Sequence, residues 1–510
     1  MSSPETDSEK ADAVVHAETT STAEKNPDDL EEKLRTHVRD PNIHFFRQLD
    51  PPVTPEEERR VRWKIDRRLP QFLFLVYVVT WLDRSNLGNA ALMGIKDAIG
   101  LDSAKYSLAI SIFFAGTCIG ELGNNLGMRF VRPSVWVASA MLIWGVIATL
   151  MAVANNAAGI TAMRFFLGIF EAAVICGAPY ILTFWYPREE WGRRIAIYLS
   201  ATAFAGAFGG WIAFGIAHIK SKLENWRLLF IIEGGLTLVI AIACFYVLPD
   251  RPHNTRWLKP REREVAEWRM LRDGNKTHGK FSWRALGWSL LDWRMIINII
   301  IYLTQVISTY TLSTFTPIIV NSFGYGDIKS QLMVAPPFCV AFVLTFAVAQ
   351  ISDRLRLRAA VFVVLSTIAA AGYLMLALLD ESHRNARYGA LFLIHPGVLS
   401  AITVALGNVT DNCCGDIKKA CAIGLYQAFG ATMGVATGYL LPDADAPLYR
   451  TGFWTLFGVT VLGTMLALFI SLEMHAENKR RDRKFGKPRE GEIYDFSEAG
   501  EKHPYWRFTP

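Results

Sequence analysis

Four charged side chains stand out inside the long apolar stretches of this sequence. Asp83 and Arg84 lie near the end of the first stretch, and Arg164 and Glu171 lie within another. At the centre of a bilayer, one charged side chain costs about 2.5 to 3.5 kcal/mol on scales based on membrane insertion. Such residues therefore face a partner or a wet cavity, where they bind ions or carry protons.

The type of each side chain indicates its chemistry. Arg84 carries a planar guanidinium group that is always charged and matches the geometry of a carboxylate. Glu171 is protonatable, and its apolar neighbours favour the neutral carboxyl, whereas a nearby arginine favours the charged one. Arg164 and Glu171 are about two helical turns apart and therefore share one face of a helix. Alternatively, Asp83, Arg84 and Arg164 lie at helix ends, where long side chains reach the polar interface at little cost.

The rest of the sequence is organised to hold these residues in a membrane. Of its 510 residues, 51% are hydrophobic, and many lie in stretches long enough for a helix to cross a bilayer. A membrane barrel would show alternating residues instead. The twelve stretches form two groups of six, with these approximate limits: 69–90, 104–127, 134–153, 159–184, 195–219 and 226–248, then 293–320, 331–351, 358–379, 387–410, 420–441 and 452–473.

The predicted fold is therefore an all-α polytopic membrane protein with twelve transmembrane helices in two six-helix bundles. The bundles are expected at 59–248 and 293–474, joined by a charged linker at 249–292 that includes a surface helix. Residues 1–58 contain fifteen acidic and six basic residues, which predicts a disordered tail without a cleavable signal peptide. Residues 475–510 are expected to form a second tail.

Lysine and arginine are concentrated in the loops on one side of the predicted bundle. Arg193-Arg194 and Lys418-Lys419 are two such pairs. Cytoplasmic loops of membrane proteins carry this excess of positive charge. Both termini are therefore predicted to be cytoplasmic, and we expect a multi-pass protein of the plasma membrane.

Several motifs are weak alone but specific in combination. They are Leu82-Asp-Arg-Ser-Asn-Leu-Gly-Asn-Ala90, Arg164-Phe-Phe-Leu-Gly-Ile-Phe-Glu-Ala172, Trp226-Arg227, Phe230-Ile-Ile-Glu-Gly234 and Ser352-Asp-Arg354. Together they resemble the major facilitator superfamily, and within it the fungal allantoate/nicotinate permease group of anion:cation symporters. The resemblance extends over roughly residues 60–475. It implies transport by alternating access, in which two helix bundles rock about a site near the midplane.

The resemblance also implies roles for the charged residues. Arg84 would hold the carboxylate of the substrate. Asp83 and Glu171 would take up protons, and Arg164 would pair with Glu171. Asn86 belongs to the same motif and is expected near the substrate.

Other positions implied by the resemblance lie in different helices. Thr117 stands where the family usually has a tyrosine, and Asn412 belongs to a pair that reads Asp411-Asn412 instead of Asn-Asn. Thr117 and Asn412 are expected to bind substrate, whereas Asp411 would repel an anion unless it is protonated or lies outside the cavity. Asp353 and Arg354 resemble a gating cluster at the inner end of the bundle.

These features predict a secondary active transporter, not an enzyme, that couples proton entry to the uptake of a small organic anion such as nicotinate or allantoate. The expected partners are the anion, protons and the lipid bilayer, with no nucleic acid. No cofactor is expected, and the cysteine spacing does not predict a metal site. We expect a monomer.

Two alternatives remain at this stage. The first is a proton-antiport exporter of a secondary metabolite or toxin, which the altered cavity positions favour. The second is a nutrient sensor that does not transport and signals through its tails, although sensors commonly have longer tails.

Overall fold

The computed structural model describes residues 52–255, 257–272, 292–355, 357–413, 416–487 and 503–509. The chain divides into residues 1–58 and residues 59–510, and the features considered below belong to the second part. The described residues form helices, turns and loops, without a β-strand.

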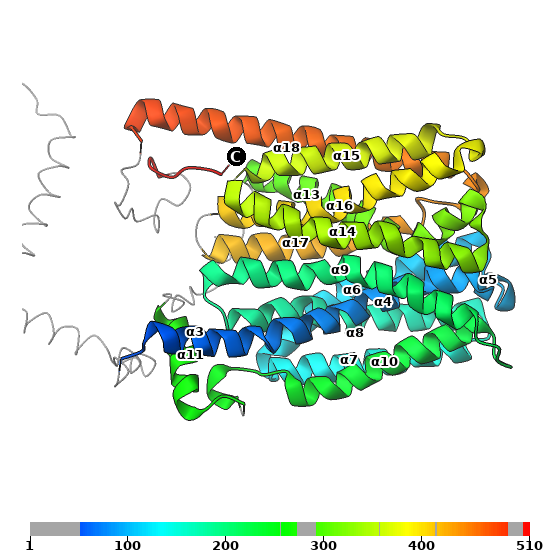
Figure 1. Ribbon diagram of the computed structural model, residues 1–510, viewed down its shortest axis with the longest axis horizontal. Helices are drawn as coiled ribbons and strands as arrows, with labels where there is room; N and C mark the ends of the chain where they lie inside the picture. The colour runs from blue at the N-terminus through cyan, green and yellow to red at the C-terminus, as the bar shows by residue number, and fades with distance from the viewer. Residues whose placement is uncertain are drawn as a thin grey trace, which may run out of the picture. The chain divides into compact units, whose positions relative to one another are not determined.

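Twelve long helices form two successive groups (Figure 1). The first half contains α4 (Leu69–Leu92), α6 (Ser103–Phe130), α7 (Pro133–Leu150), α8 (Ala157–Thr183), α9 (Arg188–Ala217) and α10 (Asn225–Val247). The second half contains α13 (Trp293–Val320), α14 (Asp327–Leu355), α15 (Arg358–Leu378), α16 (Arg384–Asn412), α17 (Asp416–Thr437) and α18 (Arg450–Phe485).

Ten helices of the described residues are long and apolar enough to cross a membrane. The other two long helices, α4 and α17, are less apolar because α4 carries the Asp83-Arg84 pair and α17 is rich in small and polar residues. Both α4 and α17 pack within the bundle. The predicted all-α membrane fold with two six-helix groups is confirmed.

Most helix packing occurs within a half, as between α6 and α8, α7 and α10, and α15 and α16. Three helix pairs make most of the contacts between the halves: α9 with α14, α6 with α17, and α4 with α13. In Figure 1 the first half lies below the second, and α9 runs along α14. The interface between the halves is therefore formed mainly by α4, α6 and α9 on one side and by α13, α14 and α17 on the other.

The halves approach most closely at the end where α4 finishes and α6 begins, which we call the distal end. A Cβ atom on Gly88 of α4 would lie 2.0 Å from the carbonyl oxygen of Thr314 of α13, so that only glycine allows this contact. Lys96 in the short helix α5 (Ile95–Ala98) pairs with Asp443 of the second half at 2.8 Å. The distal end is therefore closed in this conformation.

The opposite end, where α4 begins, is called the tail end. A Cβ atom on Gly123 of α6 or on Gly424 of α17 would have no described neighbour within 4 Å, in contrast to Gly88. Small residues let helices approach closely, but here the two glycines face open space. The contacts between the halves at Gly88 and Lys96 thus have no counterpart at these two glycines.

Replacing Gly88 by alanine is expected to hold the halves apart at the distal end and to lower transport about tenfold. Strain of about 1.4 kcal/mol on the closed state is enough for a tenfold change in its population, and the backbone of α13 cannot move aside as a side chain can. Uptake and the reactivity of a cysteine introduced at the distal end would measure the effect. Gly235→Ala is the control, because its Cβ would meet no described atom within 4 Å. Normal transport by Gly88→Ala would show that this contact is not needed.

A cluster of charges joins segments at the tail end. Arg269 of α11 (Pro260–Arg272) pairs with Glu190 at the start of α9 at 2.9 Å, and Arg194 pairs with Asp66 at 2.8 Å. Burial opposes ionisation of Glu190, but the Arg269 and Arg194 guanidinium groups hold the pKa of its carboxyl below the usual value. The linker therefore does contain a helix, and ion pairs hold it against the first half.

Candidate substrate site between the halves

A cavity of about 970 Å³, part of it open to solvent, lies between the two halves. Helices α4, α8 and α9 line it from the first half, and α13, α14, α16 and α17 line it from the second. Among the lining residues that the structure describes, Arg84 is the only charged one. The aromatic side chains that line it are Tyr77, Trp81, Tyr198, Tyr302 and Tyr310. This arrangement suits a small anion with an apolar or aromatic body.

Helix α4 presents its two charges to different surroundings. Pro70 lies in its first turn, where the absence of a backbone N–H costs nothing, and the helix ends just before Gly94, which has a φ of +89°. Consecutive residues of an α-helix point about 100° apart. Arg84 therefore faces the cavity while Asp83 faces α7 and α10.

Aromatic rings surround the Arg84 guanidinium group. Its central carbon lies 4.9 Å from the ring centre of Trp81, 5.5 Å from that of Tyr310 and 5.6 Å from that of Phe113. Aromatic faces attract cations and orient a planar guanidinium group without neutralising its charge. The rings thus hold Arg84 in place while leaving its charge available to an anion.

Arg84 forms a buried ion pair with Glu171 of α8. Its Nε lies 2.6 Å from Glu171 Oε1, and the two side chains are 3% and 0% exposed. Arg84 Nη2 and Glu171 Oε2 have no hydrogen-bond partner among the described residues. The pair therefore leaves a donor on Arg84 and an acceptor on Glu171 without a partner among the described residues.

The structure differs here from the pairing implied by the family resemblance. Glu171 pairs with Arg84 rather than with Arg164, whose Nη1 donates to the backbone carbonyl of Asp83 at 3.4 Å. Arg164 and Glu171 lie on the same stripe of α8, as expected, but α4 crosses that stripe beside Glu171. The arginine expected to bind the anion and the glutamate expected to take up a proton are thus partners of each other.

Asp83 lies in a separate polar cluster inside the first half. Its Oδ2 accepts hydrogen bonds from Trp144 Nε1 at 2.6 Å and from the Thr237 hydroxyl at 3.2 Å. Its Oδ1 accepts one from Asn86 Nδ2 at 3.2 Å. Asp83 and Asn86 do not line the cavity, so Asn86 orients Asp83 and does not face the substrate space.

Glu233 of α10 is a buried acid that the sequence analysis quoted in a motif but did not rank as a functional residue. It is 1% exposed, and neither of its carboxyl oxygens has a hydrogen-bond partner among the described residues. The signal was present, because Glu233 is the one acidic residue in the apolar stretch 226–248. The high cost of a charged side chain inside a bilayer, which singled out Glu171, singles out Glu233 equally.

Two predicted substrate residues lie away from the cavity. The Thr117 hydroxyl donates to the Phe113 carbonyl one turn earlier in α6 at 3.0 Å, and Thr117 faces Gly168 of α8. Asn412, at the end of α16, bonds the backbone of Thr509, with Nδ2 donating at 2.9 Å and Oδ1 accepting at 2.8 Å. Neither residue lines the cavity.

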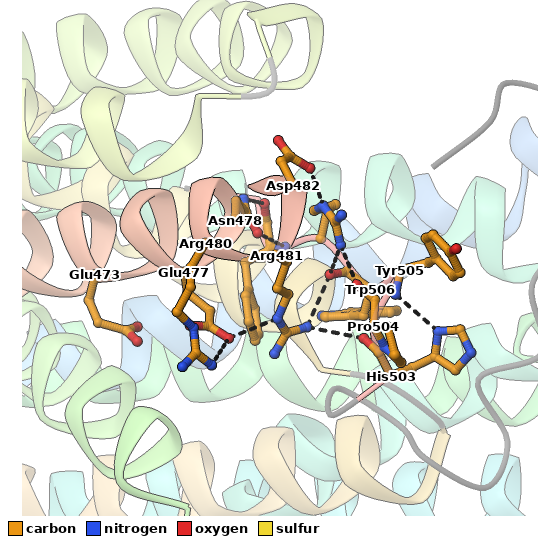
Figure 2. Close-up of polar contacts among 12 residues, drawn as sticks. Glu473, Glu477, Asn478, Arg480, Arg481, Asp482, His503, Pro504, Tyr505 and Trp506 are labelled. Atoms are coloured by element: carbon orange, nitrogen blue, oxygen red, sulfur yellow. Dashed lines mark hydrogen bonds and ion pairs between the residues drawn. The ribbon is translucent and has the colours of Figure 1, made fainter. Parts of the chain in front are cut away.

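Residues 503–509 fold back against the end of α18, as Figure 2 shows. Asn478 exchanges two hydrogen bonds with the backbone of Phe508, at 2.8 and 2.9 Å. Arg481 Nη1 donates to the Trp506 carbonyl at 3.0 Å, and Arg507 Nε lies 2.9 Å from Asp482 Oδ1. The Phe508 ring is buried in an apolar cluster with residues of α13, α15, α16 and α18. We call this segment the C-terminal strap.

The predicted gating residues lie at the tail end of α14. Arg354 is exposed there, and the side chain of Asp353 lies outside the described residues. Asp411 does not line the cavity and pairs instead with Arg358 at 2.7 Å. Its negative charge is therefore neutralised at a distance from any bound anion, which removes the conflict noted in the sequence.

Comparison with known proteins agrees with this architecture. The chain is 33% identical to the MFS transporter prlL of Fungal sp. (strain NRRL 50135), over 89% of this chain and 93% of the relative. It is 31% identical to the major facilitator-type transporter hxnP of Emericella nidulans, over 89% of this chain and 94% of that relative. Among solved structures, a D-xylose-proton symporter matches with a TM-score of 0.61 at 14% identity, over 79% of this chain and 96% of that one. A bacterial homologue of the human lysosomal transporter Spinster matches with a TM-score of 0.59 at 15% identity, over 82% of this chain and 97% of that one.

The family assignment accounts for the cavity between two halves that are closed at one end. The model of the Major Facilitator Superfamily matches residues 73–439, which include every described residue that lines the cavity. Proteins of this family are secondary transporters that work by alternating access. This chain belongs to the Major Facilitator Superfamily.

Proposed function

We propose that the chain is a proton-coupled symporter of a small organic monocarboxylate, of the kind carried by the allantoate/nicotinate permease group. The observation that carries the proposal is the position of Arg84. It is the one charged side chain among the described lining residues, and its ion-pair partner is a protonatable glutamate. An arginine in a largely apolar cavity selects a carboxylate.

The Arg84–Glu171 pair supplies a mechanism for coupling. In the empty carrier the two charges cancel. A substrate carboxylate can replace Glu171 at Arg84 without adding net charge only if Glu171 takes up a proton. A carrier loaded with the anion but not the proton would bury an uncompensated negative charge, which costs several kcal/mol. The neutral empty and fully loaded forms therefore reorient easily, and the half-loaded form does not.

We further propose that the tail end faces the cytoplasm, that the protein is a monomer and that it resides in the plasma membrane. The orientation is supported by arginines at the tail end, including Arg194 and Arg269, because basic residues favour the cytoplasmic side. In the present conformation the cavity would then be closed toward the outside.

The exporter alternative loses only the support that it drew from the altered positions Thr117 and Asp411, because neither residue lines the cavity. Export remains the second candidate function. The direction of transport in the following experiment distinguishes it from uptake.

Purified protein in proteoliposomes should accumulate an aromatic monocarboxylate such as nicotinate when the proton gradient is directed inward. A protonophore should abolish accumulation, and the uncharged amide of the same acid should neither compete nor be transported. These results follow because Arg84 needs a carboxylate and reorientation needs a proton. Uptake of acid and amide at equal rates would exclude the anion site. Accumulation of the acid only when the proton gradient is directed outward would identify a proton antiporter, which works as an exporter.

A further inference from the structure

Glu233 is one of the buried acids that the mechanism above does not use, and the least exposed of them. It projects from α10, which packs against α4, α7, α9 and the short helix η2 (Met151–Val153). Among the described residues, the charged group that acts on it is Asp83 of α4, and the nearby polar group is Asn86. No arginine, lysine or histidine of the described residues donates to its carboxyl oxygens. Glu171 differs from it, since Glu171 has Arg84 as a partner.

The two acids have unequal surroundings. Asp83 accepts hydrogen bonds from Trp144, Thr237 and Asn86, the environment that stabilises an ionised carboxylate. Beside Glu233 the only donor among the described residues is Asn86, and an ionised carboxylate with so little support is strongly unfavourable there. The hydrogen bonds of this conformation thus favour the negative charge on Asp83 and the proton on Glu233.

The position of Asp83 connects this pair to the substrate site. Asp83 is the residue before Arg84 on α4, and Thr237, one turn after Glu233 on α10, donates to its Oδ2 at 3.2 Å. When Arg84 exchanges Glu171 for a substrate carboxylate, any rotation or shift of α4 also moves Asp83 relative to Trp144 and Thr237. The hydrogen bonds that favour charge on Asp83 are thus sensitive to the state of the cavity.

We propose that Glu233 passes its proton to Asp83 when the carrier reorients, and takes it back on return. The O–H bond of Glu233 breaks as an O–H bond of Asp83 forms, and the negative charge moves the opposite way, so the pair keeps one proton throughout. This inference rests on the proton-coupled function proposed above. It makes Glu233 part of the switch between the two conformations rather than a passive buried group.

The test compares Glu233→Gln and Glu233→Asp in the proteoliposome assay. Glutamine keeps the size of the side chain and imitates its protonated form, but it cannot release a proton. Aspartate keeps a proton to exchange but leaves a gap. If Glu233 exchanges a proton, accumulation should fall about tenfold or more in Glu233→Gln and less in Glu233→Asp, while both variants still bind nicotinate. If Glu233 had only a structural role, Glu233→Gln would lose less accumulation than Glu233→Asp, because the isosteric glutamine disturbs packing least.

A conformational measurement and a control complete the experiment. Glu233→Gln should favour the conformation described here, so that a cysteine introduced at the distal end becomes less reactive than in the parent protein. Glu224→Gln, on the exposed end of the same helix, where Glu224 pairs with Arg227, should transport normally. Accumulation by Glu233→Gln at the rate of the parent protein would overturn the inference alone. Absence of proton-driven accumulation in the parent protein would instead overturn the proposed function.

Discussion

Replacing Arg84 by alanine is expected to abolish uptake of the carboxylate while the protein still reaches the membrane. The variant removes the only cation among the described residues that line the cavity. Truncating one member of a buried charge pair costs about 2 to 5 kcal/mol, which is roughly a 30- to 5,000-fold loss of affinity. Direct binding of nicotinate and its uptake into proteoliposomes would measure the effect.

This variant alone does not separate two roles of Arg84, because it also leaves Glu171 buried without its cation. The double variant Arg84→Ala/Glu171→Gln removes the unpaired carboxylate and should restore thermal stability without restoring uptake. Arg480→Ala, whose side chain is 76% exposed, is the matched arginine control and should transport normally. If the double variant transports the acid, Arg84 serves only to balance Glu171 and does not bind substrate.

Replacing Glu171 by glutamine is expected to uncouple binding from the proton. The glutamine cannot compete as an anion for Arg84, whose Nε now lies 2.6 Å from Glu171 Oε1. In the parent protein, nicotinate binding should strengthen as pH falls, because protonation of Glu171 releases Arg84. In the variant, binding should be tight and independent of pH. Equilibrium binding between pH 5 and 8 would show the difference.

Transport by Glu171→Gln should divide into two activities. The empty variant would bury an unpaired arginine, at a cost of about 3 to 5 kcal/mol, so its return step and net accumulation should fall roughly 150- to 5,000-fold. Exchange of labelled for unlabelled nicotinate should continue, because the loaded variant is neutral. The control is Glu264→Gln on α11, where the glutamate side chain is about half exposed, and this variant should transport normally. Proton-driven accumulation by Glu171→Gln would place the coupling proton on another residue.

The sequence predicted the fold well because membrane helices must satisfy their backbone internally and remain apolar for the full width of a bilayer. It was less accurate at helix ends. The last apolar stretch was expected to end near residue 473, but α18 continues to Phe485. Ion pairs one turn apart, such as Glu477 with Arg481 at 2.9 Å, support this polar extension.

The candidate site was predicted only in part, since the cost of a buried charge identifies residues but not their partners. It singled out Arg84 and Glu171 without revealing that they pair, because no local pattern shows which helix crosses α8. Thr117 was placed near the substrate by family position, yet its hydroxyl is satisfied by its own helix. The partner of Asn412 is Thr509, 97 residues along the chain, and spacing rules do not reach that far.

The C-terminal strap has a practical consequence for the experiments themselves. Thr509 is bonded to the end of α16, and Phe508 is packed among four helices of the second half. A fluorescent protein or affinity tag joined directly after these residues would strain that attachment, and purification could then select molecules with the strap pulled away. Residues 1–58 form a separate part of the chain. A tag joined at that end of the chain would not be attached to the strap itself.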